Sequence, residues 1–242
     1  MISHAELASP AATPTQVASY RHTAILVAIL LAIAISGAVF QGGSDAAAGA
    51  APSHRDRLAL YVSLLAAEWG LVAYVWRVGL RRHGTPLREL IGGRWSGWQA
   101  ALRDVGLAAG VWLIWLGAEH SLEPWLSWGH ARSVGAYLPH GPSEVALWIV
   151  LSLSAGFCEE ITFRGYFQRQ FAALSHNRVV GVVLQAALFG VAHGYQGAAA
   201  SLRITLFGLL YGAVTAWRGS LRPGIAAHAW TDIHAGWLAA LN

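Results

Sequence analysis

Long apolar runs are the feature that most constrains the fold of this chain. About seven segments carry few charged side chains, and most approach the roughly 20 residues that a helix needs to cross a bilayer. We expect helices over residues 23–40, 58–76, 102–118, 143–163, 179–193, 202–217 and 223–241. The fifth is short and would need local thinning of the bilayer or help from its neighbours. The sequence therefore predicts an all-α, polytopic transmembrane helical bundle.

The composition excludes an ordinary soluble domain and a nucleic-acid-binding protein. Hydrophobic residues make up 55% of the chain and charged residues 12%, whereas soluble domains carry about 25% charged residues. All sixteen basic residues are arginines, and they gather between the apolar runs instead of along one helix face. Cys158 is the only cysteine, so no intrachain disulfide can form, and we interpret it as a packing residue. We expect the lipid bilayer as a partner and no nucleic acid.

The arginines also predict the orientation of the bundle. Six of them lie between residues 77 and 103, so this loop and the N-terminus are expected in the cytoplasm. Residues 1–22 are small and polar, which is typical of a disordered tail. Residues 23–40 are interpreted as a retained span and not as a signal peptide, because the leader is long. Two regions follow: three N-terminal spans with their loops over 23–142, and a core of four spans over 143–242.

Acidic residues are rare in the C-terminal core. The last 98 residues contain only three acidic residues, Glu159, Glu160 and Asp232. A carboxylate inside the bilayer costs several kcal/mol, about 2.5–3.5 on insertion scales, so ionisable residues within spans indicate function by default. We therefore expect a polar site that the last four spans build together.

Each acid stands at helical spacing from another polar or ionisable group. Glu160 and Arg164 are four residues apart and share one helix face, which leaves Glu159 free to act as a general base. A purely structural role is the alternative for each motif, and we favour a structural salt bridge for the Glu160–Arg164 pair.

Two later spans carry similar pairs. Phe189 and His193 share a face, as do His228 and Asp232. A carboxylate beside an imidazole can fix its tautomer or hold it protonated. We expect Glu159 and these three polar side chains to converge on one water molecule. A histidine used only for packing, or an aspartate that only pairs with a nearby histidine, is the structural alternative.

The depths of these residues present a difficulty. Glu159 lies about 7.5 Å along its helix from Arg164, whereas His193 lies about 20 Å from Arg178. If both arginines mark the membrane surface, a straight fifth helix that begins there does not close the site. A tilted, broken or late-starting helix would be required.

The three motifs in this order resemble the CPBP intramembrane protease family, which includes CAAX prenyl endopeptidases and bacteriocin-processing or immunity (Abi) proteins. The resemblance covers residues of about 143–242 and rests on Glu159-Glu160-Arg164, Phe189-His193 and His228-Asp232. It implies hydrolysis of a peptide bond within the membrane, with Glu159 and His193 activating water and His228 and Asp232 stabilising the oxyanion. Glu160, Arg164 and Phe189 are assigned to structural support.

Asp232 departs from the family pattern, in which Asn is common at this position. Asn can donate a hydrogen bond to an oxyanion, whereas an ionised Asp cannot. Asp232 would instead hold His228 protonated, and His228 would be the donor.

Metal dependence stays open at this point. His193 and His228 are candidate ligands, and two histidines with a carboxylate can hold Zn²⁺ with a position free for water. The sequence contains no H-E-x-x-H zinc-peptidase motif and no G-x-S-x-G serine motif. We favour a glutamate mechanism that needs no cofactor.

The prediction is therefore an intramembrane endopeptidase of a bacterial inner membrane, acting on a peptide or lipidated-protein substrate. Prenylated CAAX-type and bacteriocin-related substrates are the classes that the resemblance implies. A non-catalytic immunity or scaffold protein with the same fold is the alternative. A proton-coupled transporter ranks last, because the sequence shows no convincing internal repeat.

Overall fold

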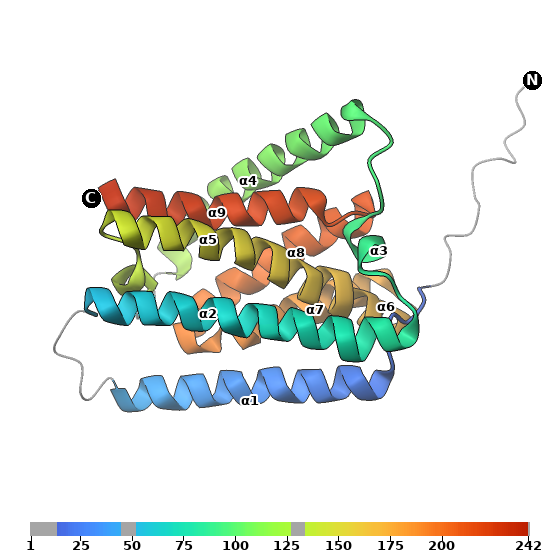
Figure 1. The fold of residues 1–242 in the computed structure, drawn as a ribbon, viewed down its shortest axis with the longest axis horizontal. Helices are drawn as coiled ribbons and strands as arrows, with labels where there is room; N and C mark the ends of the chain where they lie inside the picture. Colours follow the sequence, from blue (N-terminus) through green and yellow to red (C-terminus); the bar gives the residue numbers. More distant parts are fainter. Residues whose placement is uncertain (1–13, 45–51, 127–133, 242) are drawn as a thin grey trace, which may run out of the picture.

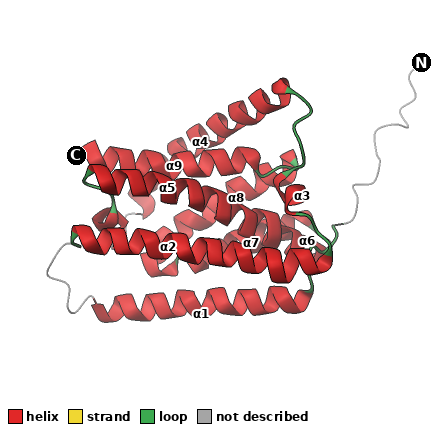
Figure 2. Ribbon diagram, viewed as in Figure 1, coloured by secondary structure: helices red, strands yellow, loops and turns green. Residues whose placement is uncertain are grey.

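Helices form all the regular secondary structure in residues 14–44, 52–126 and 134–241, which the computed structural model describes (Figure 2). The long helices are α1 (Tyr20–Ser44), α2 (His54–Tyr74), α4 (Trp98–Leu126), α5 (Pro142–Glu159), α7 (Arg178–Ala192), α8 (Ala198–Arg218) and α9 (Arg222–Leu241). Two short helices are α3 (Leu87–Ile91) and α6 (Gln168–Ser175). Two π-helical segments are η2 (Val75–Leu80) and η5 (Glu160–Phe167), and three 3₁₀ turns are η3 (Arg81–His83), η4 (Val134–Tyr137) and η6 (Gly194–Gln196). The predicted all-α bundle is confirmed.

Each of the seven predicted spans corresponds to a helix, although they differ in length and apolarity. In the described part of the chain, five helices are long and apolar enough to cross a membrane. They cover Tyr20–Gly37, His54–His83, Trp98–Leu126, Pro142–Ser175 and Ala198–Arg218. α7 has only 15 residues, and α9 is not among the five. The number and apolarity of these helices make the chain an integral membrane protein.

The fourth span extends well beyond its predicted end at residue 163. α5, η5 and α6 follow one another without a break and form one helical stretch of 34 residues, Pro142–Ser175. We expected the span to end before Arg164 because an arginine usually marks the membrane surface. The prediction was wrong because the Arg164 side chain is fully buried inside the protein.

The N-terminal boundary also differs from the expectation. Residues 1–13 of the predicted disordered tail lie outside the described residues, but its last part packs on the bundle. The backbone N–H groups of Val17 and Ala18 donate to Gln170 Oε1 over 2.7 and 3.3 Å. α1 begins at Tyr20, so the predicted boundary at residue 22 falls inside this helix.

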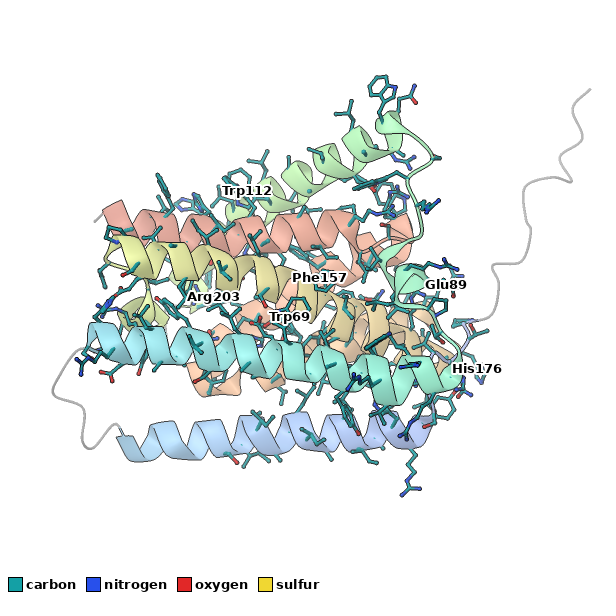
Figure 3. All side chains as sticks on the ribbon, in the orientation of Figure 1. Trp69, Glu89, Trp112, Phe157, His176 and Arg203 are labelled. Atoms are coloured by element: carbon teal, nitrogen blue, oxygen red, sulfur yellow. The ribbon has the colours of Figure 1, made fainter. Side chains whose placement is uncertain are left out.

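In the bundle α5 runs antiparallel to α9, and α7 runs antiparallel to α8, whereas α2 and α5 run in the same direction. Figure 1 shows α2 beside α5 and α5 beside α9, with α7 and α8 behind them and one end of α4 leaning away. The main packing pairs are α7 with α8, α5 with α9, α6 with α7 and α2 with α5. Residues of α3, α6 and the start of α9 gather at one end, where Figure 3 labels Glu89 and His176.

Two glycines allow the helices that carry the site to approach closely. A Cβ atom on Gly156 of α5 would lie 2.7 Å from the backbone nitrogen of Ala229 in α9. A Cβ atom on Gly208 of α8 would lie 3.0 Å from the Cα of Ala186 in α7. Gly208 and Gly212 form a G-x-x-x-G motif, a pattern typical of closely packed membrane helices. These close approaches bring α5 against α9 and α7 against α8.

Candidate active site

Two neighbouring glutamates face different surroundings at the junction of α5 and η5. Glu159 is the last residue of α5, and its side chain is 20% exposed. Glu160 begins the π-helical segment and is fully buried beside Arg164, with Glu160 Oε1 and Arg164 Nη1 3.0 Å apart. π-helical turns inside α-helices occur frequently at functional sites. The local helix geometry thus leaves one carboxylate accessible and pairs the other.

Aromatic rings enclose the guanidinium group of Arg164. Its central carbon lies 4.3 Å from the ring centre of Phe189 and 5.6 Å and 5.8 Å from those of Phe207 and Tyr211. Ring faces attract a cation most strongly where water is excluded. The position of Phe189 in its motif therefore has a physical explanation, because this ring holds the arginine that pairs with Glu160.

His193 caps the C-terminal end of α7 and points toward Glu159. Its Nδ1 lies 2.8 Å from the carbonyl oxygen of Phe189, so Nδ1 carries the proton and donates it to that oxygen. This bond turns Nε2 toward the site, where it lies 3.8 Å from Glu159 Oε1. A neutral His193 therefore presents a lone pair on the side of Glu159.

His228 of α9 connects the two glutamates. Its Nδ1 lies 3.0 Å from Glu160 Oε1, and its Nε2 lies 3.6 Å from Glu159 Oε2. Asp232, one turn further along α9, places Oδ2 3.7 Å from the same Nε2. The three motifs thus come together, and Glu159 directs one oxygen toward each histidine.

The difficulty over depth disappears because Arg164 does not mark the membrane surface. The helical stretch that carries Glu159 continues to Ser175, sixteen residues further on, and α7 starts at Arg178 next to that end. His193 lies fifteen residues from Arg178, so both residues stand about 20 Å from the same turn. α7 therefore reaches the site as one uninterrupted helix.

Glu68 of α2 is a polar neighbour that the sequence analysis missed. The hydroxyl of Ser154 donates to Glu68 Oε2 over 2.7 Å, and Glu68 interacts electrostatically with Glu159, Asp232 and His228. α2 is held against α5 next to this point, where Trp69 stacks on Phe157 with ring centres 5.7 Å apart (Figure 3). The available signal was a lone acid inside the apolar run 58–76, which the rule for intramembrane carboxylates would have selected.

Cys158 takes no part in this arrangement. It is buried at 2% exposure, and its sulfur contacts the hydroxyl of Ser154 at 3.8 Å. This environment fits the packing role that the sequence indicated.

The donor groups do not form a metal site as they stand. In the described part of the chain, no group of three or more His, Cys, Asp or Glu side chains is arranged to hold a metal ion. His193 Nε2, His228 Nε2 and Glu159 are the chemically suitable donors for Zn²⁺, with Glu159 oxygens 3.8 Å and 3.6 Å from the two nitrogens. Asp232 is a further oxygen donor at 3.7 Å from His228. We therefore derive no step that passes through a metal.

Comparison with known families supports the resemblance seen in the motifs. Residues 141–234 match the family model described as type II CAAX prenyl endopeptidase Rce1-like. This range contains all three motifs and leaves α1, α2, α3 and α4 outside. No curated protein and no solved structure matches the chain significantly. The resemblance to the CPBP proteases is thus confirmed for the C-terminal core.

Proposed function

From this family match, we propose that the protein is an intramembrane endopeptidase that uses Glu159 to activate water. The observation that carries the proposal is the placement of Glu159 between two histidines from different helices, with its oxygens 3.8 Å from His193 and 3.6 Å from His228. Direct hydrogen bonds are shorter than this, and a water molecule can bridge groups at such separations. The fold thus offers a place for the water that hydrolysis consumes.

In the proposed reaction, Glu159 takes a proton from water while the oxygen attacks the carbonyl carbon of the peptide bond. The lone pair of His193 Nε2 orients the same water, because its Nδ1 proton is held by Phe189. The tetrahedral intermediate then collapses as the proton passes from Glu159 to the leaving nitrogen. The carbon–nitrogen bond breaks, and a carboxylic acid and an amine are released.

We assign stabilisation of the oxyanion to His228. Asp232 accepts hydrogen bonds when ionised and cannot replace the donor that an Asn would supply. Its Oδ2 lies 3.7 Å from His228 Nε2, where a carboxylate favours the charged imidazolium. The Nε2–H of His228 is then the donor for the developing negative charge.

The proposed substrate is a peptide or lipidated protein bound in the membrane. The family description names CAAX prenyl endopeptidases, so a prenylated C-terminal peptide is the first class to test. We propose a bacterial inner membrane with the N-terminus in the cytoplasm. Arginines of the chain, among them Arg21, Arg82, Arg94, Arg178 and Arg218, lie at the bundle end where α1 begins and α8 ends, which supports this orientation.

The test is cleavage of membrane-anchored and prenylated peptides by the purified protein in detergent. Wild type is compared with Glu159→Gln and His193→Ala, and with Glu89→Gln as a control for an exposed acid outside the site. Each protein is assayed with and without a chelator. Cleavage by wild type and Glu89→Gln that is lost in the other two variants supports the proposal.

Other outcomes separate the alternatives. Cleavage that persists in both site variants would refute the assignment of Glu159 and His193. If the wild-type protein loses cleavage when the chelator is added, a metal is required and the glutamate mechanism is replaced. A protein that binds these peptides and cleaves none of them fits the non-catalytic scaffold instead.

A further inference from the structure

A second polar feature lies at the arginine-rich end of the bundle, between α1 and the π-helical segment η2, which follows α2. It is a cleft of about 400 Å³. It is lined by Ser19, Arg21, His22, Ile25, Tyr74, Val78, Gly79, Arg82 and His83. None of these residues belongs to the three protease motifs, and the cleft lies outside the region that the family model matches.

The charge in this cleft is positive and has no acidic counterpart among the lining residues. Arg21 and Arg82 are exposed, and Arg82 interacts electrostatically with the ring of His22. α1 begins at Tyr20, so the partial positive charge of its N-terminus adds to the same region. Like charges held together without an acid make a site that an anion would stabilise.

His22 supplies a buried polar atom without a protein partner. Its side chain is 5% exposed, and its Nδ1 lies 2.6 Å from the hydroxyl of Tyr166. The ring stacks on Tyr74 with centres 4.9 Å apart, which fixes its plane. The other ring nitrogen, Nε2, is buried and has no hydrogen-bond partner within the protein. Buried polar atoms normally have partners, so this nitrogen is suited to a ligand.

The backbone of η2 leaves room for the ring of His22. Gly79 lies in the π-helical segment, and a Cβ atom there would come within 2.8 Å of His22 Cε1. Departures from α-helical geometry of this kind are often found at functional sites. The position of His22 therefore depends on a local distortion and on a glycine, and neither serves the candidate active site.

We propose that this cleft binds the phosphate group of an anionic phospholipid. Arg21 and Arg82 provide forked donors that match phosphate oxygens, and His22 Nε2 provides a third group deeper in the cleft. Ile25 and Val78 give the cleft an apolar wall for the start of an acyl chain. Anionic headgroups gather at the cytoplasmic surface, which is where the proposed orientation puts this end. The proposal concerns lipid binding and does not require peptidase activity.

The experiment measures binding of dioctanoyl phosphatidic acid to the purified protein by calorimetry in detergent. Dioctanoylglycerol serves as the matched lipid without a phosphate, and inorganic phosphate serves as the matched ion without a lipid. The variant is Arg21→Gln with Arg82→Gln. The control is Arg88→Gln with Arg94→Gln, which removes the same charge from exposed positions outside the cleft.

We expect saturable binding of phosphatidic acid, weakened about tenfold or more in the cleft variant and within about twofold of wild type in the control. Dioctanoylglycerol should bind much more weakly than phosphatidic acid. An equal loss of phosphatidic acid binding in the cleft variant and the control would show that only the overall positive charge matters, and would overturn the proposed site. Inorganic phosphate binding as tightly as the lipid would overturn the lipid as the source of the phosphate. Because all four arginines are exposed, unchanged thermal stability should accompany each variant.

Discussion

The C-terminal core and the N-terminal helices differ in how much of their surface they bury. In the span Pro142–Ser175, half of the apolar window is buried inside the protein, whereas the value is 17% for His54–His83 and 22% for Trp98–Leu126. The core region carries all three motifs and matches the protease family model. The comparison indicates that the C-terminal helices build the polar site and that the N-terminal helices mainly enclose it and face lipid.

The ion pair inside the core differs from the one that joins the core to the N-terminal helix α2. Glu160 and Arg164 form a pair with no exposed surface, surrounded by aromatic rings in the core. Glu144 at the start of α5 accepts from Arg57 of α2 over 2.8 Å and also from the backbone N–H of His140. Glu160 has one further polar partner, His228 Nδ1 at 3.0 Å, deep in the protein, whereas Glu144 has its partners at the edge of the bundle.

The largest effect should come from the accessible glutamate of the core. Glu159→Gln keeps the shape of the side chain but removes the general base, so kcat for peptide cleavage should fall by about 10²–10⁴-fold. Thermal stability should change little, because the Glu159 side chain is partly exposed and makes no short hydrogen bond in the structure. Rate measurements on a cleaved peptide, beside Glu144→Gln from the bundle edge, test this. Equal losses of kcat in Glu159→Gln and Glu144→Gln would show that Glu159 has no special role in cleavage.

Breaking the buried pair of the core should cost stability. Arg164→Leu removes the guanidinium partner of Glu160 and leaves only His228 beside its carboxylate, so the free energy of unfolding should fall by about 3–5 kcal/mol. The double variant Glu160→Gln/Arg164→Leu should recover part of this loss, since no uncompensated charge remains. Arg57→Leu should cost less than Arg164→Leu. Detergent unfolding curves give all three values, and an Arg57→Leu loss as large as that of Arg164→Leu would contradict the comparison.

Close packing inside the core should matter next. Gly156→Ala adds a methyl group 2.7 Å from Ala229 N and 2.9 Å from Ile225 O, so α5 and α9 must separate. We expect a loss of about 1–3 kcal/mol in stability, with reduced cleavage because Glu159 moves away from His228. Gly70→Ala in α2 is the control, as a Cβ there would meet nothing within 4 Å. Equal losses of stability in Gly156→Ala and Gly70→Ala would contradict the expected importance of close packing between α5 and α9.

The smallest effect should come from Glu68, an N-terminal residue that reaches the site. Glu68→Gln keeps a group that can bond Ser154 but removes an ionisable carboxyl group near Glu159 and Asp232. We expect a change in kcat of about tenfold or less, with normal folding, because Glu68 acts on the site at a distance. Cleavage rates with Glu68→Gln and the exposed Glu123→Gln give the result. A loss of kcat as severe as that of Glu159→Gln would instead show that Glu68 of α2 takes part in catalysis.

Much of the fold followed from the sequence because its signals are local. Apolar runs and arginine-rich loops predicted the seven helices, and the spacing of four residues placed Glu160 near Arg164 and His228 near Asp232. Helix geometry fixes such pairs whatever surrounds them. The predicted end of the fourth span before Arg164 was wrong. The sequence alone does not distinguish an arginine at a membrane surface from an arginine that is buried among aromatic rings.

The sequence by itself determined the class of protein, the helices and the short-range pairs, because each depends on residues within one or two turns. Only the tertiary structure decided which faces meet. It set Glu159 between His193 and His228, brought Glu68 from α2 beside them, and left His22 Nε2 without a partner in a separate cleft. These arrangements depend on how deeply each helix sits and on where glycines let two backbones approach, and packing between distant segments sets both.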